Sequence, residues 1–240
     1  MIKIAHFGDV HIRNLERQYE YRRQFSKIYK VLEEKDVDII VIVGDLFENY
    51  IEISNEAKVL ASDFLNQLSK LAKEIIVVPG NHDLRKKNLN RVDSVKTIVD
   101  ILKNPKITYF GKSGFFQDKI FDNIVWVNHS HLEKGINPWI DIPQTRDNDK
   151  IYIDLFHDPI LGCSNDLGKI FDDNSIYRGL DSFKGDFVML ADIHKRQYFR
   201  KNKSAAYCGS TIQQDFGESV EKHGFLLWKI EDNKNFEIEE

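Results

Sequence analysis

The chain has 240 residues, of which 42% are hydrophobic, 12% aromatic and 30% charged. This composition is that of a globular protein long enough to bury a core, and it excludes the disordered, fibrous and disulfide-scaffold classes. The formal net charge of −4 argues against a surface that is basic throughout, although it leaves room for a local basic patch.

The first hundred residues alternate between strand and helix patterns. Three short apolar runs are rich in β-branched residues, as strands are, and after each of them apolar residues recur at the three- and four-residue spacing of a helix. Ser54 is placed to cap the second of these helices. In chain order the predicted elements cover residues 2–7, 15–32, 37–43, 54–71, 75–78 and 91–102.

The rest of the chain has shorter apolar runs separated by glycine, asparagine and aspartate, which is typical of strands. Such runs surround Ile107, Phe115 and Ile124 and recur at 151–156, 187–190 and 225–230. Strand–helix alternation followed by mixed strands predicts a layered α/β or α+β fold, built on a sheet whose first strands are parallel.

Residues with metal-ligating side chains follow one predicted strand after another. The carboxyl ends of parallel strands meet at one edge of a sheet, where such folds place their functional groups. Asp9 and His11 are two residues apart, so an extended segment would point both side chains the same way. Asp45 follows a buried strand, and its two oxygens can be shared between two cations. The residues at these strand ends are Asp9, His11, Asp45, Asn81, His82, His157, Asp192 and His194.

Each of these motifs also has an ordinary structural explanation. A Gly-Asp pair is usually a turn, and a single histidine is more often a structural residue than a ligand. Five motifs at successive strand ends are harder to explain in this way, because turns account for glycine and aspartate but not for repeated histidine and asparagine. The sequence therefore predicts a dinuclear metal site.

The same motifs resemble those of a known family, the calcineurin-like metallophosphoesterases, in order and spacing over most of the chain. They are Asp9-x-His11, Gly44-Asp45, Gly80-Asn81-His82-Asp83, His157 and Asp192-x-His194. Within that superfamily, three segments resemble the nuclease subunit of the Mre11 and SbcD repair complexes, especially their viral and phage-like branch. These segments are Gly44-Asp45-Leu46-Phe47, Ala191-Asp192-Ile193-His194-Lys195 and Tyr207-Cys208-Gly209-Ser210 with Gln213-Gln214. The resemblance implies a four-layer α/β/β/α sandwich.

The resemblance also implies two divalent metal ions and the residues that hold them. The ligands of the first metal would be Asp9, His11, Asp45 and His194. The ligands of the second would be Asp45, Asn81, His157 and Asp192, so that Asp45 bridges the two ions. Oxygen and imidazole ligands without thiolate favour manganese, with magnesium as the alternative. The implied chemistry is two-metal hydrolysis of a phosphate ester, in which the catalytic residue His82 contacts the scissile phosphate or protonates the leaving oxygen.

Two positions depart from the family pattern. Asp192 stands where relatives generally have histidine, which makes the site more negative, and we expect a tighter hold on a hard ion. Glu48 stands where cellular relatives often have a second active-site histidine, which leaves His82 as the stronger catalytic candidate and makes Glu48 a candidate active-site residue.

Basic residues follow two of the predicted ligand motifs. No acidic residue lies between Arg85 and Arg91 or between Lys195 and Lys203, and basic loops of this kind suit the DNA backbone. The alternative is that they are solvated loop faces. The predicted DNA contacts are Arg85, Lys86, Lys87, Lys195 and Arg196.

We therefore expect residues 1–240 to form a nuclease core, with closing strands and an acidic tail from about residue 200 and with no evident capping or ATPase-binding region. The expected activity is metal-dependent DNA cleavage by exonuclease or endonuclease action in repair or recombination. A small-ester phosphoesterase and a DNA-binding scaffold with weak catalysis are the alternatives. The resemblance implies a Rad50/SbcC-like ATPase partner and allows a homodimer. We find no signal peptide or membrane-length apolar segment, so a cytoplasmic or nuclear protein without a membrane partner is expected.

Overall fold

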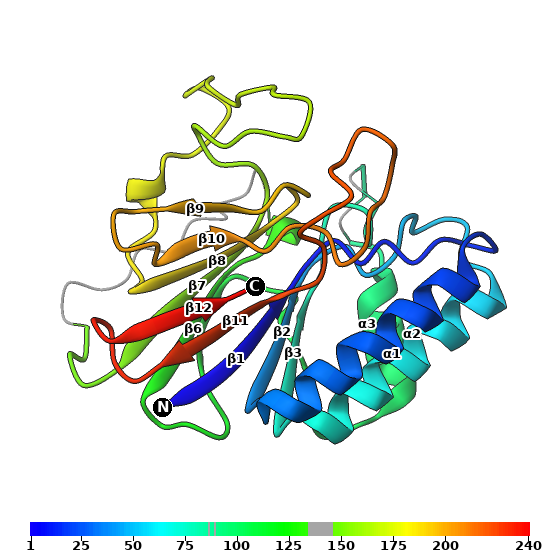
Figure 1. The fold of residues 1–240 in the computed structure, drawn as a ribbon, viewed down its shortest axis with the longest axis horizontal. Coiled ribbons are helices and arrows are strands. Elements are labelled where there is room, and N and C mark those ends of the chain that lie inside the picture. Colours follow the sequence, from blue (N-terminus) through cyan, green and yellow to red (C-terminus); the bar gives the residue numbers. More distant parts are fainter. Residues whose placement is uncertain (86, 89, 134–145) are drawn as a thin grey trace.

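The computed structural model describes residues 1–85, 87–88, 90–133 and 146–240. In this part of the chain two six-stranded sheets stack face to face (Figure 1). The order of the first sheet is β12 (Phe236–Glu239), β11 (Leu226–Ile230), β1 (Ile2–Phe7), β2 (Ile39–Val43), β3 (Glu74–Val78) and β4 (Ile107–Tyr109). The order of the second is β5 (Gly114–Gln117), β6 (Ile124–His129), β7 (Ile151–His157), β8 (Phe187–Ala191), β10 (Ala205–Tyr207) and β9 (Gln197–Phe199).

Parallel pairing dominates the centre of both sheets. Strands β1 to β4 pair in parallel in the first sheet, and β6, β7, β8 and β10 do so in the second. The connections β1–β2 and β2–β3 each contain a helix, as parallel neighbours require. The carboxyl ends of the central strands therefore lie at one edge of the sandwich, as the sequence predicts.

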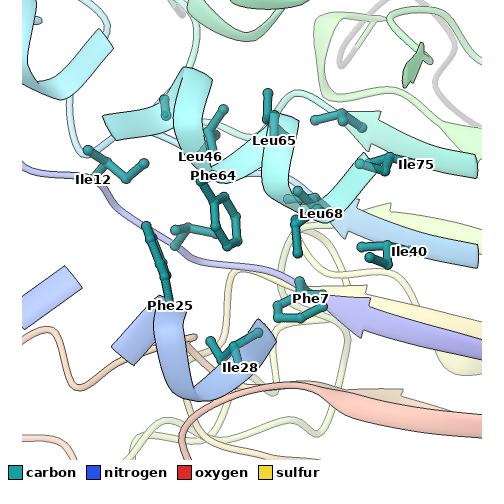
Figure 2. Close-up of a cluster of buried hydrophobic side chains, with 14 of the residues drawn as sticks. Phe7, Ile12, Phe25, Ile28, Ile40, Leu46, Phe64, Leu65, Leu68 and Ile75 are labelled. Carbon is teal, nitrogen blue, oxygen red and sulfur yellow. The ribbon is translucent and has the colours of Figure 1, made fainter. Parts of the chain in front are cut away.

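The helices α1 (Gln18–Lys35), α2 (Asn55–Leu71) and α3 (Ser94–Leu102) cover the outer face of the first sheet (Figure 1). Their apolar stripes pack against the outward side chains of β1, β2 and β3. Figure 2 shows this core, in which the rings of Phe25 from α1 and Phe64 from α2 stack with centroids 4.0 Å apart. The caps set the helix boundaries, since Ser54 accepts a hydrogen bond from the Ala57 amide and Asp93 accepts one from the Lys96 amide.

The two sheets enclose a second apolar core. It is formed by the inward side chains of β1, β2, β3 and β11 on one side and of β6, β7 and β8 on the other. Trp126 from β6 and Trp228 from β11 are its largest members, and both are fully buried. This core fixes the position of one sheet relative to the other.

The α/β class with two stacked sheets is confirmed. The expected α/β/β/α order has a second outer layer of α-helices, and the outer layer on the second sheet differs from it. Among the described residues, segment 158–186 covers that face as loops with one 3-10 helix, η2 (Leu180–Ser182). This segment is rich in glycine, aspartate, asparagine and serine, which favour turns over helix. Ile160, Cys163 and Phe183 nevertheless bury their side chains against Val188 and Tyr207.

The acidic tail is part of the sheet. Strand β12 pairs with β11, and its glutamates meet basic side chains from elsewhere in the fold. Glu239 accepts hydrogen bonds from Lys35 over 2.7 Å and from Lys229. Within the described residues, none of the helices combines the length and the apolar character needed to cross a membrane.

Candidate metal centre

The strand ends of both sheets supply one cluster of polar side chains. Asp9 and His11 follow β1, Asp45 follows β2, and Asn81 follows β3 in the first sheet. His157 ends β7, and Asp192 and His194 follow β8 in the second sheet. The structure brings all seven sequence-predicted ligands together at the edge where the two sheets meet.

The backbone of four of these residues is left-handed, a conformation that non-glycine residues rarely adopt. The φ angles are 51° at Asp9, 48° at His11, 55° at Asp45 and 86° at Asp192. Gly44 has a φ of 86°, and a Cβ there would lie 2.2 Å from Nδ1 of His157. Backbone strain of this kind collects at functional sites, because the surrounding fold enforces it to aim the side chains.

The side chains form two donor sets. In the first set, His11 Nε2 lies 3.8 Å from an Asp9 oxygen, 3.6 Å from Asp45 Oδ2 and 3.1 Å from His194 Nε2. His194 Nε2 lies 3.7 Å from Asp9 Oδ1. Donor atoms at these mutual distances can surround one ion, and they are the four residues predicted for the first metal.

The second set shares Asp45 with the first. His157 Nε2 lies 3.2 Å from Asp45 Oδ2 and 3.6 Å from Asp192 Oδ1. Asn81 joins this set, because its Nδ2 donates to Asp192 Oδ1. The same Asp45 oxygen therefore faces both sets, as expected of a bridging carboxylate.

The chemistry of the cluster fits divalent ions. Asn81 Oδ1 is buried and has no hydrogen-bond partner among the described residues, which leaves a carbonyl oxygen available as a ligand. Asp9 and Asp45 are buried and Asp192 is largely so, and this concentration of negative charge requires cations. Oxygen and imidazole donors suit manganese or magnesium.

Polar contacts on the outer nitrogens orient the three imidazoles. His157 Nδ1 donates to the Val43 carbonyl over 2.6 Å, which leaves Nε2 as the atom that faces the cluster. His194 Nδ1 bonds to Glu218, and His11 Nδ1 lies 2.9 Å from Glu48 Oε2. Such partners fix the tautomer and raise the basicity of metal-ligating histidines.

The sequence did not reveal two residues that organise this cluster. Glu218 lies 24 residues after His194, outside the motifs of the sequence analysis, and its side chain also accepts from the Ser210 hydroxyl and the Gln214 amide. Asp83 is fully buried and accepts from the amides of Leu46, Phe47 and Gly80, so it ties the loop after β2 to the loop after β3. Asp83 stands within one of the ligand motifs, but its structural role becomes visible only when the two loops meet.

Replacing Glu218 with glutamine is expected to weaken binding of the first metal about 10- to 100-fold, because the outer partner of His194 would lose its charge. Titration calorimetry with Mn²⁺ measures the change. Glu221→Gln, an exposed change in the same loop, is the matched control and should leave both affinities unaltered. Equal affinities in Glu218→Gln and the parent chain would contradict the orienting role.

His82 and Glu48 lie at the open side of the cluster. The His82 amide donates to Asp45 Oδ1 over 2.8 Å, and its ring Nδ1 lies 2.8 Å from the Glu48 carbonyl oxygen. A cavity of about 680 Å³ adjoins them, lined by residues that include Glu48, Asn81, His82, Arg85 and Lys87. Glu48, from the loop after β2, thus contacts His11.

The predicted DNA contacts differ in their surroundings. Arg85 and Lys87 line the cavity beside His82, whereas Lys86 lies outside the described residues. Lys195 Nζ donates to the Ser164 hydroxyl over 3.3 Å. The Arg196 side chain is only 4% exposed and bonds to the Cys208 carbonyl and Glu240. The Arg196 guanidinium thus packs against the fold, and a DNA contact at this residue stays a prediction.

The electrostatics of the metal-free cluster predict a pH dependence. Burial lowers the pKa of His194, but Glu218 and Asp9 outweigh it and raise the pKa to about 9, and Asp45 raises the pKa of buried His157 well above its usual value. Burial raises the pKa of Asp192 to about 7 despite the opposing effect of His157.

Metal binding must displace these protons, so the apparent affinity for Mg²⁺ is expected to rise about tenfold per proton per pH unit between pH 6 and 8. Titrations in two buffers of different ionisation enthalpy count the protons released. A count of zero at pH 7 would show that the histidines are neutral before the metal enters.

A two-sheet α/β sandwich with carboxylates, imidazoles and a carboxamide collected at its strand ends defines a metal-dependent hydrolase. The model of the calcineurin-like phosphoesterase family matches residues 2–196, and the chain belongs to this family. Its members use divalent metal ions, in agreement with the clusters of ligating side chains described above.

Individual relatives include a viral protein, a nuclease subunit and a DNA repair protein. The R555 protein of Acanthamoeba polyphaga mimivirus is 36% identical over 98% of this chain. A subunit of the nuclease SbcCD from Staphylococcus epidermidis is 26% identical over 97%, and the DNA double-strand break repair protein Mre11 of Methanopyrus kandleri is 34% identical over 36%. The aligned regions span 18%, 67% and 20% of the lengths of these three relatives.

Proposed function

We propose that this protein is a metal-dependent DNA nuclease of the Mre11/SbcD type, which hydrolyses phosphodiester bonds in double-strand break repair, recombination or DNA end processing. The observation that carries the proposal is the pair of donor sets that share Asp45, with His82 at their open side. Similarity to the SbcCD and Mre11 proteins supports DNA as the substrate.

The residues divide the work in the proposed reaction. Two divalent ions, with Mn²⁺ preferred, would supply Lewis acidity and charge stabilisation when bound. Asp9, His11, Asp45 and His194 would hold one ion, and Asp45, Asn81, His157 and Asp192 the other. His82 would contact the scissile phosphate and give a proton to the leaving oxygen.

The cations beside His82 favour a polymeric substrate over a small ester. Arg85 lines both the cavity at His82 and a neighbouring cavity of about 540 Å³, which also contains Lys58 and Arg91. Positive side chains spread over two adjoining cavities can contact several phosphates of one strand, whereas a small ester would use only one.

Cleavage assays with Mn²⁺ test the proposal on three substrates: linear duplex DNA, hairpin DNA and bis(p-nitrophenyl) phosphate. The proposal predicts turnover of both DNA substrates, with kcat/KM well above that for the small diester. Turnover of the small ester alone would replace it with a small-molecule phosphoesterase, and DNA binding without turnover would replace it with a scaffold.

By the same similarity, the proposal includes an ATPase of the Rad50/SbcC kind as a partner and a homodimer as an assembly. The Staphylococcus epidermidis relative is by name one subunit of a nuclease complex. Co-purification with such an ATPase and light scattering of the chain alone test these two points.

A further inference from the structure

A cavity far from the metal centre contains a buried carboxylate that the protein leaves incompletely paired. Glu74 begins strand β3, whereas the metal-centre residues follow the other end of that strand. The cavity has a volume of about 350 Å³ and lies beside strands β4 and β5, an edge strand of each sheet. Its lining contains Glu74, Asp118, Lys119 and Thr108 together with several aromatic residues, among them Trp126.

The two carboxylates of this cavity differ in how they are satisfied. Asp118 accepts hydrogen bonds from the Trp126 indole over 2.7 Å and from two backbone amides over 2.8 Å. The Glu74 side chain is only 4% exposed, and its Oε1 accepts from the Thr108 hydroxyl. Its Oε2 is buried and has no hydrogen-bond partner among the described residues.

Lys119 is the cation that faces Glu74 in the described part of the chain, and it does so loosely. Its Nζ lies 3.9 Å from Glu74 Oε1 and donates to the Thr108 hydroxyl over 2.7 Å. The Lys119 side chain is 57% exposed, so it lies at the mouth of the cavity. The buried Glu74 carboxylate therefore faces one exposed ammonium group, and a buried carboxylate is costly unless it is fully paired.

This arrangement selects one class of cation. A guanidinium group makes its best contact with both oxygens of a carboxylate, and here it would have to share Oε1 with the Thr108 hydroxyl. An ammonium group is a point charge that can bind the single free oxygen, and its alkyl stem can lie along aromatic walls. Aromatic faces also attract cations directly.

We propose that this cavity binds a primary alkylammonium group, as a free polyamine or a lysine side chain carries, with Glu74 as its anchor. Lys119 occupies the mouth and competes with the incoming cation. The site is separate from the metal centre, so it does not depend on the proposed nuclease function.

NMR spectroscopy of the whole chain with saturating Mg²⁺ tests the proposal, because Trp126 lines the cavity and its indole N–H donates to Asp118, a second lining residue. The probe is n-butylammonium, and n-butanol is its neutral control. We expect a saturable shift of the Trp126 indole resonance with the ammonium and none with the alcohol. Equal shifts with both, or no shift with the ammonium, would overturn the proposal.

Two variants should change the affinity for n-butylammonium in opposite directions. Glu74→Gln should weaken it about tenfold or more, because a charge-assisted hydrogen bond is lost. Lys119→Ala should tighten it several-fold, because the competing ammonium is removed. Lys27→Ala, an exposed lysine on α1, is the matched control and should have no effect. If Glu74→Gln fails to fold, the comparison of Lys119→Ala with Lys27→Ala decides alone, and equal affinities there would reject the site.

Two further probes separate the sources of the ammonium group. Tighter binding of spermidine than of N-acetyl-lysine-N-methylamide assigns the cavity to a free polyamine. Tighter binding of the lysine amide assigns it to a lysine side chain of a protein. Binding of neither contradicts the proposal.

Discussion

Replacing Asp45 with asparagine is expected to lower kcat at least about 1000-fold and to weaken both metal ions. Its Oδ2 lies 3.6 Å from His11 Nε2 and 3.2 Å from His157 Nε2, so this atom faces both donor sets. A neutral carboxamide can present only its oxygen, and it carries no charge to balance two cations. Loss of several kcal/mol of transition-state stabilisation corresponds to a factor of this size.

Calorimetry and kinetics together separate the metal-binding effect of Asp45→Asn from general damage. The number of Mn²⁺ ions bound per chain should fall below two at concentrations that saturate the parent protein. Asp63→Asn, an isosteric change at an exposed carboxylate on α2 that pairs with Arg22, is the matched control. Two bound ions and normal turnover in Asp45→Asn would refute the bridging role.

His82→Ala is expected to lower the rate of DNA cleavage about 100- to 10 000-fold while the chain still binds two metal ions. The His82 ring lies at the open side of the cluster with its Nδ1 beside the Glu48 carbonyl oxygen, where it can reach a substrate. The two donor sets are complete without it. The change should therefore appear in kcat and leave Mn²⁺ stoichiometry as it is in the parent protein.

The leaving group reveals whether His82 supplies a proton. p-Nitrophenolate leaves without protonation, whereas the sugar alkoxide of DNA does not. The rate loss in His82→Ala should therefore be much smaller for bis(p-nitrophenyl) phosphate than for DNA. Equal losses on both substrates would assign His82 to phosphate contact alone, and normal DNA cleavage would remove it from the mechanism.

The arrangement of the strands and the metal cluster could be predicted because both rest on local patterns. Apolar runs such as residues 37–43 mark buried strands, and parallel strands bring their carboxyl ends to one edge. Ligands that directly follow those strands, such as Asp45 and Asn81, therefore have to meet. Their positions follow without any knowledge of the loops.

Contacts between loops could not be predicted in the same way. Glu218 meets His194 through a loop whose path depends on the whole fold, so no spacing rule identifies it. Arg196 follows a ligand motif, yet its guanidinium turns inward to the Cys208 carbonyl. Segment 158–186 packs on the second sheet through irregular structure. The spacing of its apolar residues therefore does not reveal which face of that sheet it covers.

The candidate metal centre draws its side chains from both sheets and would couple the two sheets mechanically. Asp9 and Asp45 extend from the first sheet, while His157 and Asp192 extend from the second. Bound ions would link the two sheets, whose shared core is apolar. The spacing of the two ions would then depend on how the sheets sit on each other. Replacing Trp126 or Trp228, which lie deep between the sheets, with a smaller residue would leave a cavity and let one sheet shift relative to the other. Catalysis would thus slow without any change to an active-site residue, since a displacement of 1 Å can cost about 100-fold in rate.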